Sequence, residues 1–490
     1  MSNGSNGNKK NVVVIGAGIG GMGVGALLQS RGYRVTVVEK NNFVGGKCSS
    51  YARDGFVVDA AFHIFSQGSK GPHGMINDKV GGDLKWIVHD PFATARVGKK
   101  GSMLVPQSVF TAVPFGGMAF LKGTIRPSII KTLRTVLKNF GVKEFLMTLI
   151  RIAMVDETFI SSIDDMTFYE FISKFTDDEQ IHRLMANLSL ISFVVPYTEG
   201  SAGELLWCLI HSYRKGTMGV PQGGVREIGG SYSRAFIKFD GNLRLGTGVK
   251  RILVEDGKAR GVETEEGEEI KADMVISNAG IKRTVELAGE QNFPEEYISY
   301  VKGLKESYAA LMIKLALDRR ITSLPRLTLL YVPNTKGENM TDFLRTGGIA
   351  EEPPMCMVMP SDWDPSTAPP GRCLVLVGGM GNPQTTPENL DHCKRIMDNV
   401  ENYLYELYPE IKSHVVWKER YSVDHVAKVT GRPTGECIGL GQYPSQVGAK
   451  KPSVITPIKD LMLVGCDAGA RGVGTEQAAY SAIYVSNLLG

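Results

Sequence analysis

The apolar positions at the start of the chain switch between two periods. Residues 11–15 form a short β-branched run, which predicts a buried strand. Helical spacing of apolar side chains follows through Met22, Leu27 and Leu28 and stops at Arg31. A second β-branched run covers residues 34–38. This strand–helix–strand order predicts the first unit of a parallel α/β sheet.

Hydrophobic patterns further along the chain predict more elements. The pattern is helical over residues 156–196, 226–239 and 387–408, and from about residue 475 to the end. Alternating short runs between residues 243 and 280, broken by Asp-Gly and Glu-Gly turns, predict a β-meander. Further strands are predicted at residues 308–317, 328–332, 355–359, 373–378 and 461–465.

The turn between the first strand and helix carries the first candidate chemistry. Gly16, Gly18 and Gly21 form a G-x-G-x-x-G motif. Such glycines allow a tight turn, a close approach of the backbone to a pyrophosphate, and close packing of helix on strand. The helix N-terminus offers free N–H groups to phosphate, and Glu39 at the end of the second strand can accept hydrogen bonds from a ribose. The combination predicts a dinucleotide site rather than a simple glycine-rich turn.

The residues after Glu39 resemble a known family. A turn at residues 45–47 (Gly-Gly-Lys) precedes Gly-Phe-x-x-Asp at residues 55–59, and a Gly-x-Pro-x-Gly-Gly turn follows at residues 219–224. This order is similar to the flavin-binding segments of phytoene desaturases and carotenoid isomerases, within the flavin-containing amine oxidase superfamily. Lys47 stands where that family usually has Arg. The resemblance implies that the dinucleotide is FAD.

The C-terminus extends this resemblance. Gly465 and Asp467 match the Gly-Asp of the family, with Cys466 inserted between them, and this pattern disfavours NAD(P) as sole cofactor. Ala470-Arg471 replaces the Pro-Gly common in carotenoid desaturases. Carried over by position, the resemblance implies FAD contacts at Gly16, Gly18, Ile19, Gly20, Gly21, Glu39, Lys40, Gly45, Gly46, Lys47, Ala61, Phe62, His63, Val249, Asn278, Ala279, Gly465, Asp467, Val473, Gly474 and Thr475.

The implied fold class is α/β. The resemblance implies a Rossmann-type FAD-binding domain with an inserted α+β substrate domain and a basic helical segment that could face a membrane. We expect a disordered tail at residues 1–10, and three parts of the FAD-binding domain at residues 11–100, 218–285 and 448–490. Residues 101–217 would form a helical substrate or membrane-facing segment, and residues 286–447 the substrate domain.

Three residues are candidates for catalysis. His63 follows Asp59 closely enough to approach the flavin, in a pattern similar to the Asp-x-Gly-x-His of retinol saturase-like relatives, although Ala61 replaces the glycine. Its alternative is a packed, hydrogen-bonded histidine. Arg471 could stabilise negative charge on the reduced flavin or anchor an anionic substrate. Glu476 could act as an acid or base, or simply complement a helix dipole.

The resemblance implies an FAD-dependent oxidoreductase. It would act on C–C bonds of an apolar, polyene or isoprenoid-type substrate by desaturation, saturation or isomerisation, with hydride transfer at flavin N5. Amine oxidase-type C–N oxidation is the alternative within enzymes, and a non-catalytic flavin-binding partner protein is the alternative outside them. The sequence leaves the substrate, the electron acceptor and the oligomeric state open.

Composition and charge bear on the binding partners and the cellular compartment. A net charge of +4 is too small to indicate nucleic-acid binding. The seven scattered cysteines lack C-x-x-C spacing, which indicates reduced thiols in the cytoplasm and no metal site. Residues 91–155 hold ten Lys or Arg and one acid, Glu144, among apolar residues. This stretch predicts either peripheral docking on a cytoplasmic membrane face or helices with a solvated basic side.

Overall fold

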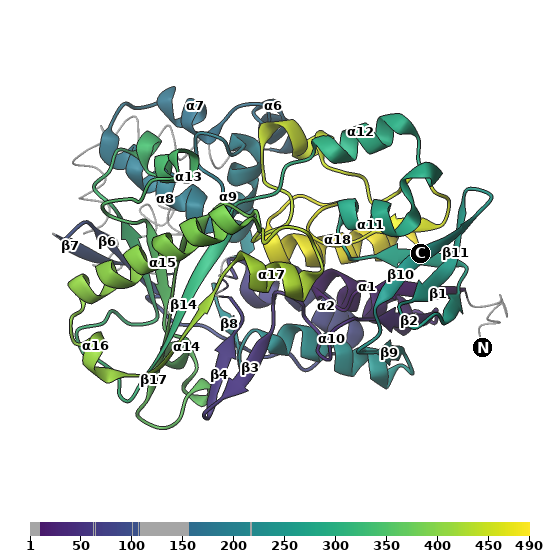
Figure 1. Cartoon of the computed structure of the whole chain (residues 1–490), viewed down its shortest axis with the longest axis horizontal. Helices are drawn as coiled ribbons and strands as arrows, with labels where there is room; N and C mark the ends of the chain where they lie inside the picture. The colour runs from purple at the N-terminus through teal and green to yellow at the C-terminus, as the bar shows by residue number, and fades with distance from the viewer. Residues whose placement is uncertain are drawn as a thin grey trace, which may run out of the picture.

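The computed structural model describes residues 10–61, 63, 65–99, 101–105, 107, 156–215 and 218–490. Residues 1–9 of the predicted tail, residues 108–155 of the basic stretch, and Phe62 lie outside the described residues. Two main sheets organise the rest. Figure 1 shows β1 and β2 of the first sheet at one end of the molecule, and β6 and β7 of the second sheet at the other.

The first sheet has five parallel strands in the order β19-β13-β1-β2-β9. They are β1 (Asn11–Ile15), β2 (Arg34–Val38), β9 (Asn242–Arg244), β13 (Met274–Ser277) and β19 (Leu461–Leu463). Helices α1 (Ile19–Ser30), α2 (Pro72–Val80), α10 (Arg226–Lys238) and α18 (Gly474–Leu488) pack together beside it. Parallel strands covered in this way need nearly continuous apolar sequence, which is what the β1 and β2 segments supply.

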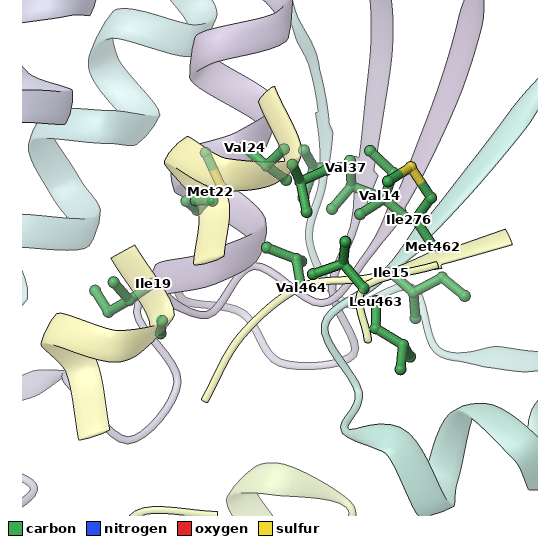
Figure 2. Packing of buried hydrophobic residues seen from close by; sticks show 14 of the residues in the cluster. Val14, Ile15, Ile19, Met22, Val24, Val37, Ile276, Met462, Leu463 and Val464 are labelled. Atoms are coloured by element: carbon green, nitrogen blue, oxygen red, sulfur yellow. The ribbon is translucent and has the colours of Figure 1, made fainter. Parts of the chain in front are cut away.

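The core of this region forms where strands and helix meet. Val14, Val37 and Ile276 of three neighbouring strands pack with Met22 and Val24 of α1 (Figure 2). All five side chains are fully buried. Helix α1 is buried on nearly every side because α10 and α18 both contact it. An apolar sequence with small residues suits a helix in that position.

Smaller sheets and helices accompany the two main sheets. Strands β10 (Val249–Glu255), β11 (Lys258–Thr264) and β12 (Glu269–Lys271) form the predicted meander, and β3 (Ser50–Arg53) pairs with β4 (Phe56–Asp59) in a hairpin. Strands β5 (Trp86–Ile87) and β8 (Val220–Pro221) also pair. Helices α11 (Ile281–Ala288) and α12 (Glu295–Gly303) follow β13.

The second sheet has seven strands in the order β18-β14-β17-β16-β15-β6-β7. They are β6 (Ala93–Val97), β7 (Gly101–Val105), β14 (Ala309–Leu317), β15 (Thr328–Val332), β16 (Met355–Val358), β17 (Cys373–Gly381) and β18 (Val415–Tyr421). Helix α15 (Pro387–Leu407) packs on β14 and β17. Short helices α13 (Asp342–Thr346), α14 (Pro360–Trp363), α16 (Ile411–His414) and α17 (Val423–Thr430) lie in the connections.

Four further helices complete the second region: α6 (Glu157–Ser162), α7 (Phe168–Ser173), α8 (Glu179–Phe193) and α9 (Ala202–Lys215). Their buried side chains share one core with the seven-stranded sheet. None of the helices within the described residues is long and apolar enough to cross a membrane.

The structure confirms the predicted α/β fold class and the predicted strands and helices of both regions. Two assignments differ from the strand pairing. The sequence groups residues 93–97 with the FAD-binding region and residues 101–105 with a helical segment, whereas β6 and β7 pair with each other and β6 pairs with β15 in the seven-stranded sheet. The Ala93 side chain is buried in a cluster with Cys356 of β16 and with Leu327, which precedes β15, and this packing holds β6 there.

Candidate functional site

One cavity of ≈ 1460 Å³ runs from the five-stranded sheet to the seven-stranded sheet. Sites for a single small ligand typically enclose about 300–1,000 Å³, so this cavity has room for a cofactor and a second molecule. Its wall changes character along its length. Backbone turns and polar side chains form the end near β1, which we call the nucleotide end, and apolar side chains form the other end, which we call the chamber.

The turn from β1 to α1 forms the floor of the nucleotide end. A Cβ at Gly21 would lie 1.9 Å from the carbonyl oxygen of Gly16, so close packing of helix on strand requires glycine there. The Gly45 N–H donates to the Ala17 carbonyl at 2.8 Å, which brings the Gly45 turn against this loop. Helix α1 begins with no side-chain cap and no acid in its first turn. Its free N–H groups therefore suit a pyrophosphate.

Glu39 is the acidic group of this end. Its buried carboxylate accepts hydrogen bonds from the backbone N–H groups of Ala17 and Asn41, both at 2.8 Å. These bonds fix the side chain between the two strand ends, and Glu39 lines the cavity beside Thr247 and Val249. A carboxylate held in this way can still accept hydrogen bonds from ribose hydroxyls. The nucleotide end therefore fits the adenosine part of FAD.

Most of the predicted cofactor residues line this cavity. They are Gly16, Gly18, Ile19, Gly20, Glu39, Lys40, Gly45, Gly46, Lys47, Ala61, His63, Val249, Asn278, Ala279, Gly465, Val473, Gly474 and Thr475, and the predicted catalytic Glu476 joins them. Gly21, Asp467 and Arg471 do not line it. Phe62 lies outside the described residues.

The Asp467 carboxylate binds two backbone N–H groups and one arginine of the protein itself. Its carboxylate accepts from the N–H groups of Ile281 (3.1 Å) and Leu440 (3.2 Å) and pairs with Arg432 (Nη2–Oδ2, 3.0 Å). Burial raises the pKa of Asp467, but Arg432 and the Ile281 N–H outweigh burial and lower it overall. The sequence expects Asp467 to contact FAD, whereas in the structure these partners occupy the carboxylate.

Arg432 is a cavity-lining residue that the sequence did not single out. Besides Asp467 it binds Glu436 (Nη1–Oε1, 2.8 Å), which is fully buried. Lys47 donates to the Glu436 carbonyl at 3.1 Å and also lines the cavity. Lys47 and Arg432 therefore put two cationic side chains beside the phosphate-binding loop. Arg432 lies more than 400 residues after that loop, so no local motif could have identified it.

His63 stands in the cavity wall as a neutral ring. Its Nδ1 lies 3.0 Å from the Ala61 carbonyl, so Nδ1–H donates and Nε2 is left as an acceptor. Burial lowers the pKa of His63 to about 4, which keeps the ring uncharged at neutral pH. The ring stacks on Phe65 with centroids 5.7 Å apart.

Glu476 lies in the first turn of α18, where α18 meets the cavity. Its buried carboxylate accepts from the Gln67 N–H (3.0 Å), the Ser66 hydroxyl (3.0 Å) and the Gln67 side-chain amide (3.2 Å). Tyr480 in turn donates to Gln67 Oε1 at 2.6 Å. These bonds fix the carboxylate in the wall between the nucleotide end and the chamber.

Arg471 does not line the cavity and belongs to a buried ion cluster. It binds Asp164 (Nη2–Oδ2, 2.6 Å) and Glu204 (Nη1–Oε2, 2.9 Å), and Lys451 also binds Glu204 (3.2 Å). Glu204 is fully buried and accepts the Gly472 N–H at 2.7 Å as well. The sequence expects Arg471 at the flavin. A buried guanidinium needs carboxylate partners, and α9 and the loop after α6 supply them here.

The chamber is built from α8, α9 and the seven-stranded sheet. Leu184 and Leu188 of α8, Leu205 and Leu209 of α9, and Leu330 of β15 are typical of its wall. Among the described residues that these elements contribute to the wall, none is Asp, Glu, Lys, Arg or His. An unpaired charge would be costly to bury there, so the chamber suits an uncharged, apolar molecule. No group of His, Cys, Asp or Glu in the described part of the chain could hold a metal ion.

Sequence comparison finds related proteins over nearly the whole chain. The sequence model of a family described as "Flavin containing amine oxidoreductase" matches residues 19–489. A zeta-carotene-forming phytoene desaturase of Myxococcus xanthus is 25% identical, and the match covers 98% of this chain and 94% of that protein. An all-trans-retinol 13,14-reductase of Danio rerio is 24% identical, covering 93% and 82%. A phytoene desaturase of Cercospora nicotianae is 24% identical. That match covers 76% of this chain but only 61% of the longer relative.

Solved structures show the same fold. An oxidoreductase from Methanosarcina mazei superposes with a TM-score of 0.70 at 21% identity, covering 97% of this chain and all of the other. Putrescine oxidase bound to putrescine superposes with a TM-score of 0.66 at 12% identity, covering 98% and 99%.

Proposed function

Because the chain belongs to the flavin containing amine oxidoreductase family, we propose that it oxidises, reduces or isomerises C–C bonds of an extended apolar polyene or isoprenoid-type molecule. Family membership confirms the predicted flavin cofactor and the predicted oxidoreductase class. The substrate class is the proposal.

One observation carries it: the chamber wall contributed by α8, α9 and the seven-stranded sheet has no charged side chain among the described residues, and the chamber and the nucleotide end belong to one cavity. An ammonium substrate would need a carboxylate in that wall. Glu476 lines the same cavity, and Ser66 and Gln67 already donate to its carboxylate. The names of the desaturase and reductase relatives agree with an apolar chain as substrate.

The chain's own residues would hold the substrate, exclude water and place polar groups near the reacting bond. FAD, when bound, would supply hydride acceptance or donation. The apolar chamber excludes water from the reacting chain. His63 offers a neutral Nε2 acceptor, and Glu476 offers a fixed carboxylate at the same wall. We propose both as catalytic residues and Arg471 as a positioning residue for the turn before α18.

The experiment adds a long polyene to the purified flavoprotein without oxygen and follows the flavin absorption band. Bleaching with loss of hydrogen from the polyene is expected for desaturation. An unchanged flavin band with a shifted polyene spectrum would indicate isomerisation. Bleaching by a diamine alone would favour the amine oxidase alternative, and a flavin that no candidate reduces would favour a non-catalytic binding protein.

Variants at the cavity wall test the catalytic residues. His63→Ala and Glu476→Gln should lower turnover about 10²–10⁴-fold if the side chain transfers a proton. Both variants should keep the flavin, because Glu39 and the β1–α1 turn are untouched. Full activity in either variant would remove that residue from the proposal.

We also propose that the protein binds peripherally to the cytoplasmic face of a membrane. Phe159, Phe175 and Leu184, on or beside helices α6 to α8, expose 42%, 54% and 50% of their surface, and Leu184 also lines the cavity. The basic stretch of the sequence precedes these helices. Flotation with anionic vesicles tests this: Phe175→Ser with Leu184→Ser should reduce recovery in the lipid fraction, and recovery should fall with added salt.

A further inference from the structure

A single line of residues crosses the face of the seven-stranded sheet that borders the cavity. Strand pairing sets the residues of this line side by side: Tyr421 pairs with Met312, Met312 with Gly378, Gly378 with Cys356, Cys356 with Leu330, and Leu330 with Ala95. Paired residues in neighbouring strands point to the same face of a sheet. We call this line the cross-strand strip.

The strip forms part of the cavity wall over most of its length. Tyr421, Gly378, Cys356, Leu330 and Ala95 all line the cavity, from β18 across to β6. At about 4.8 Å between neighbouring strands, the strip is about 24 Å long. Three of these five residues, Gly378, Cys356 and Ala95, are small, so their side chains take up little of the cavity along this line.

The strip has a near end and a far end relative to the flavin site. Lys47 at the nucleotide end donates to the Glu436 carbonyl (3.1 Å). The residue after Glu436, Cys437, donates its N–H to the carbonyl of Tyr308, which directly precedes β14 (3.1 Å). Tyr421 therefore lies at the near end, on the strand beside β14. Ala95 lies at the far end, since β6 is five strands further on and at the opposite end of the molecule from β1 (Figure 1).

We propose that the cross-strand strip fixes how long a substrate the enzyme accepts. An extended apolar chain lies across the strands, with its reacting bond near Tyr421 and its free end toward Ala95. This inference rests on the proposed function for the class of molecule, but the length limit itself comes from the register of the sheet. Ala95 and Cys356 are then specificity-determining residues, at the end and in the middle of the strip.

Two variants and one control test the strip. Ala95→Phe fills the far end, and Cys356→Phe fills a point three strands from Tyr421. Thr94→Phe is the matched control. Thr94 directly precedes Ala95 on β6, so its side chain points to the other face of the sheet, and it does not line the cavity. Ala95→Leu supplies a smaller change should a phenylalanine variant fail to hold flavin. The flavin spectrum of each purified variant shows whether its fold is intact.

The measurement is binding of a homologous series of polyenes and of straight-chain alkanes to each flavin-loaded protein. Overfilling a packed site should weaken binding of the longest chains about tenfold or more in Ala95→Phe and leave the shortest unchanged. The limit should move to shorter chains in Cys356→Phe, whereas Thr94→Phe should match the wild type. Equal weakening at every length, or unchanged binding in both strip variants, would overturn the proposal.

Alkane binding separates this inference from the proposed function. Alkanes need no turnover, so a position-dependent length limit can be measured even in a protein that oxidises no polyene. A limit that follows the strip without flavin reduction by polyenes would support the strip and contradict the proposed reaction. Polyene turnover without such a limit would support the reaction and overturn the strip.

Discussion

The two ends of the cavity recognise molecules in different ways. At the nucleotide end, backbone turns and a few polar side chains such as Glu39 and Lys47 form the wall. In the chamber, mostly apolar side chains from α8, α9 and the strands of the seven-stranded sheet form it. The first kind of wall depends on the conformation of short segments, and the second on how distant segments pack. Cofactor binding at the nucleotide end should therefore be most sensitive to the loss of single polar contacts, and binding in the chamber to changes of side-chain volume.

The largest expected effect lies where the two ends are joined. Glu204 on the chamber helix α9 binds Arg471, Lys451 and the Gly472 N–H of the turn before α18. Glu204→Ala leaves buried cations short of a partner, which costs about 3–5 kcal/mol. Urea unfolding of the flavin-saturated protein should show this loss of stability, with earlier release of flavin.

Two controls make that result specific. Glu204→Gln keeps an acceptor for the Gly472 N–H and should lose less stability than Glu204→Ala. Glu351→Ala changes an exposed acid and should stay within about 0.5 kcal/mol of the wild type. Equal stability of Glu204→Ala and wild type would mean that the cluster does not hold the two ends together.

Acid should weaken the core beneath the nucleotide end. His73 of α2 is buried beside the Tyr232 hydroxyl (Nδ1–O, 3.2 Å), and burial lowers its pKa from 6.5 to about 3. In the unfolded chain His73 therefore binds a proton near pH 6.5, whereas in the folded chain it stays neutral until the pH approaches 3. The stability that His73 contributes is present above pH 6.5 and is lost as the pH falls toward 3, about 3 kcal/mol of it by pH 4.

The comparison of wild type with His73→Asn isolates this effect. Burial raises the pKa of Asp59 to about 6, and its carboxyl titrates in the same range with the opposite sign, but it is present in both proteins. Unfolding free energies measured from pH 7 to pH 4 should converge for the two proteins as the pH falls. A constant difference across that range would contradict this prediction, because it would mean that His73 binds its proton as readily in the folded protein as in the unfolded chain.

Cofactor affinity should depend on one carboxylate at the nucleotide end. Glu39→Gln places an N–H₂ group against either the Ala17 or the Asn41 N–H, and hydrogen bonds to a charged group contribute about 1.5–3 kcal/mol. Titration of the apoprotein with FAD should show affinity reduced about ten- to a hundredfold. Glu268→Gln, which breaks an exposed pair with Arg244, should change affinity less than about twofold.

The same contrast decides what the sequence could predict. Gly16, Gly18, Gly21 and Glu39 stand at spacings that a strand–turn–helix imposes locally, so this turn and its carboxylate were predictable, whereas Arg432 was not. The strands and helices of the second region were predictable too, because hydrophobic periodicity is also local. Their order in the sheet was not, and neither was the pairing of β6 with β15.

Long-range partners explain the remaining differences. Arg471 meets Asp164 and Glu204, each more than 260 residues earlier, and a sequence pattern cannot indicate that a cation has such partners. Lys314 is similar: it sits in an apolar strand, and the structure places its ammonium 4.9 Å from the rings of both Tyr51 and Tyr421. Burial lowers the pKa of Lys314 to about 8. Both residues owe their state to tertiary packing.

The smallest expected effect tests a departure from the family pattern. Lys47 replaces the usual arginine, and its ammonium donates to the Glu436 carbonyl while remaining 22% exposed. Lys47→Arg keeps the charge and the donor, and partly exposed ion pairs contribute about 1 kcal/mol or less, so FAD affinity should change less than about fivefold. Lys47→Met, which removes the charge but keeps a similar stem, should weaken FAD binding more. If the two variants lose affinity equally, the shape of the lysine matters more than its charge, and the nucleotide end would depend on packing as the chamber does.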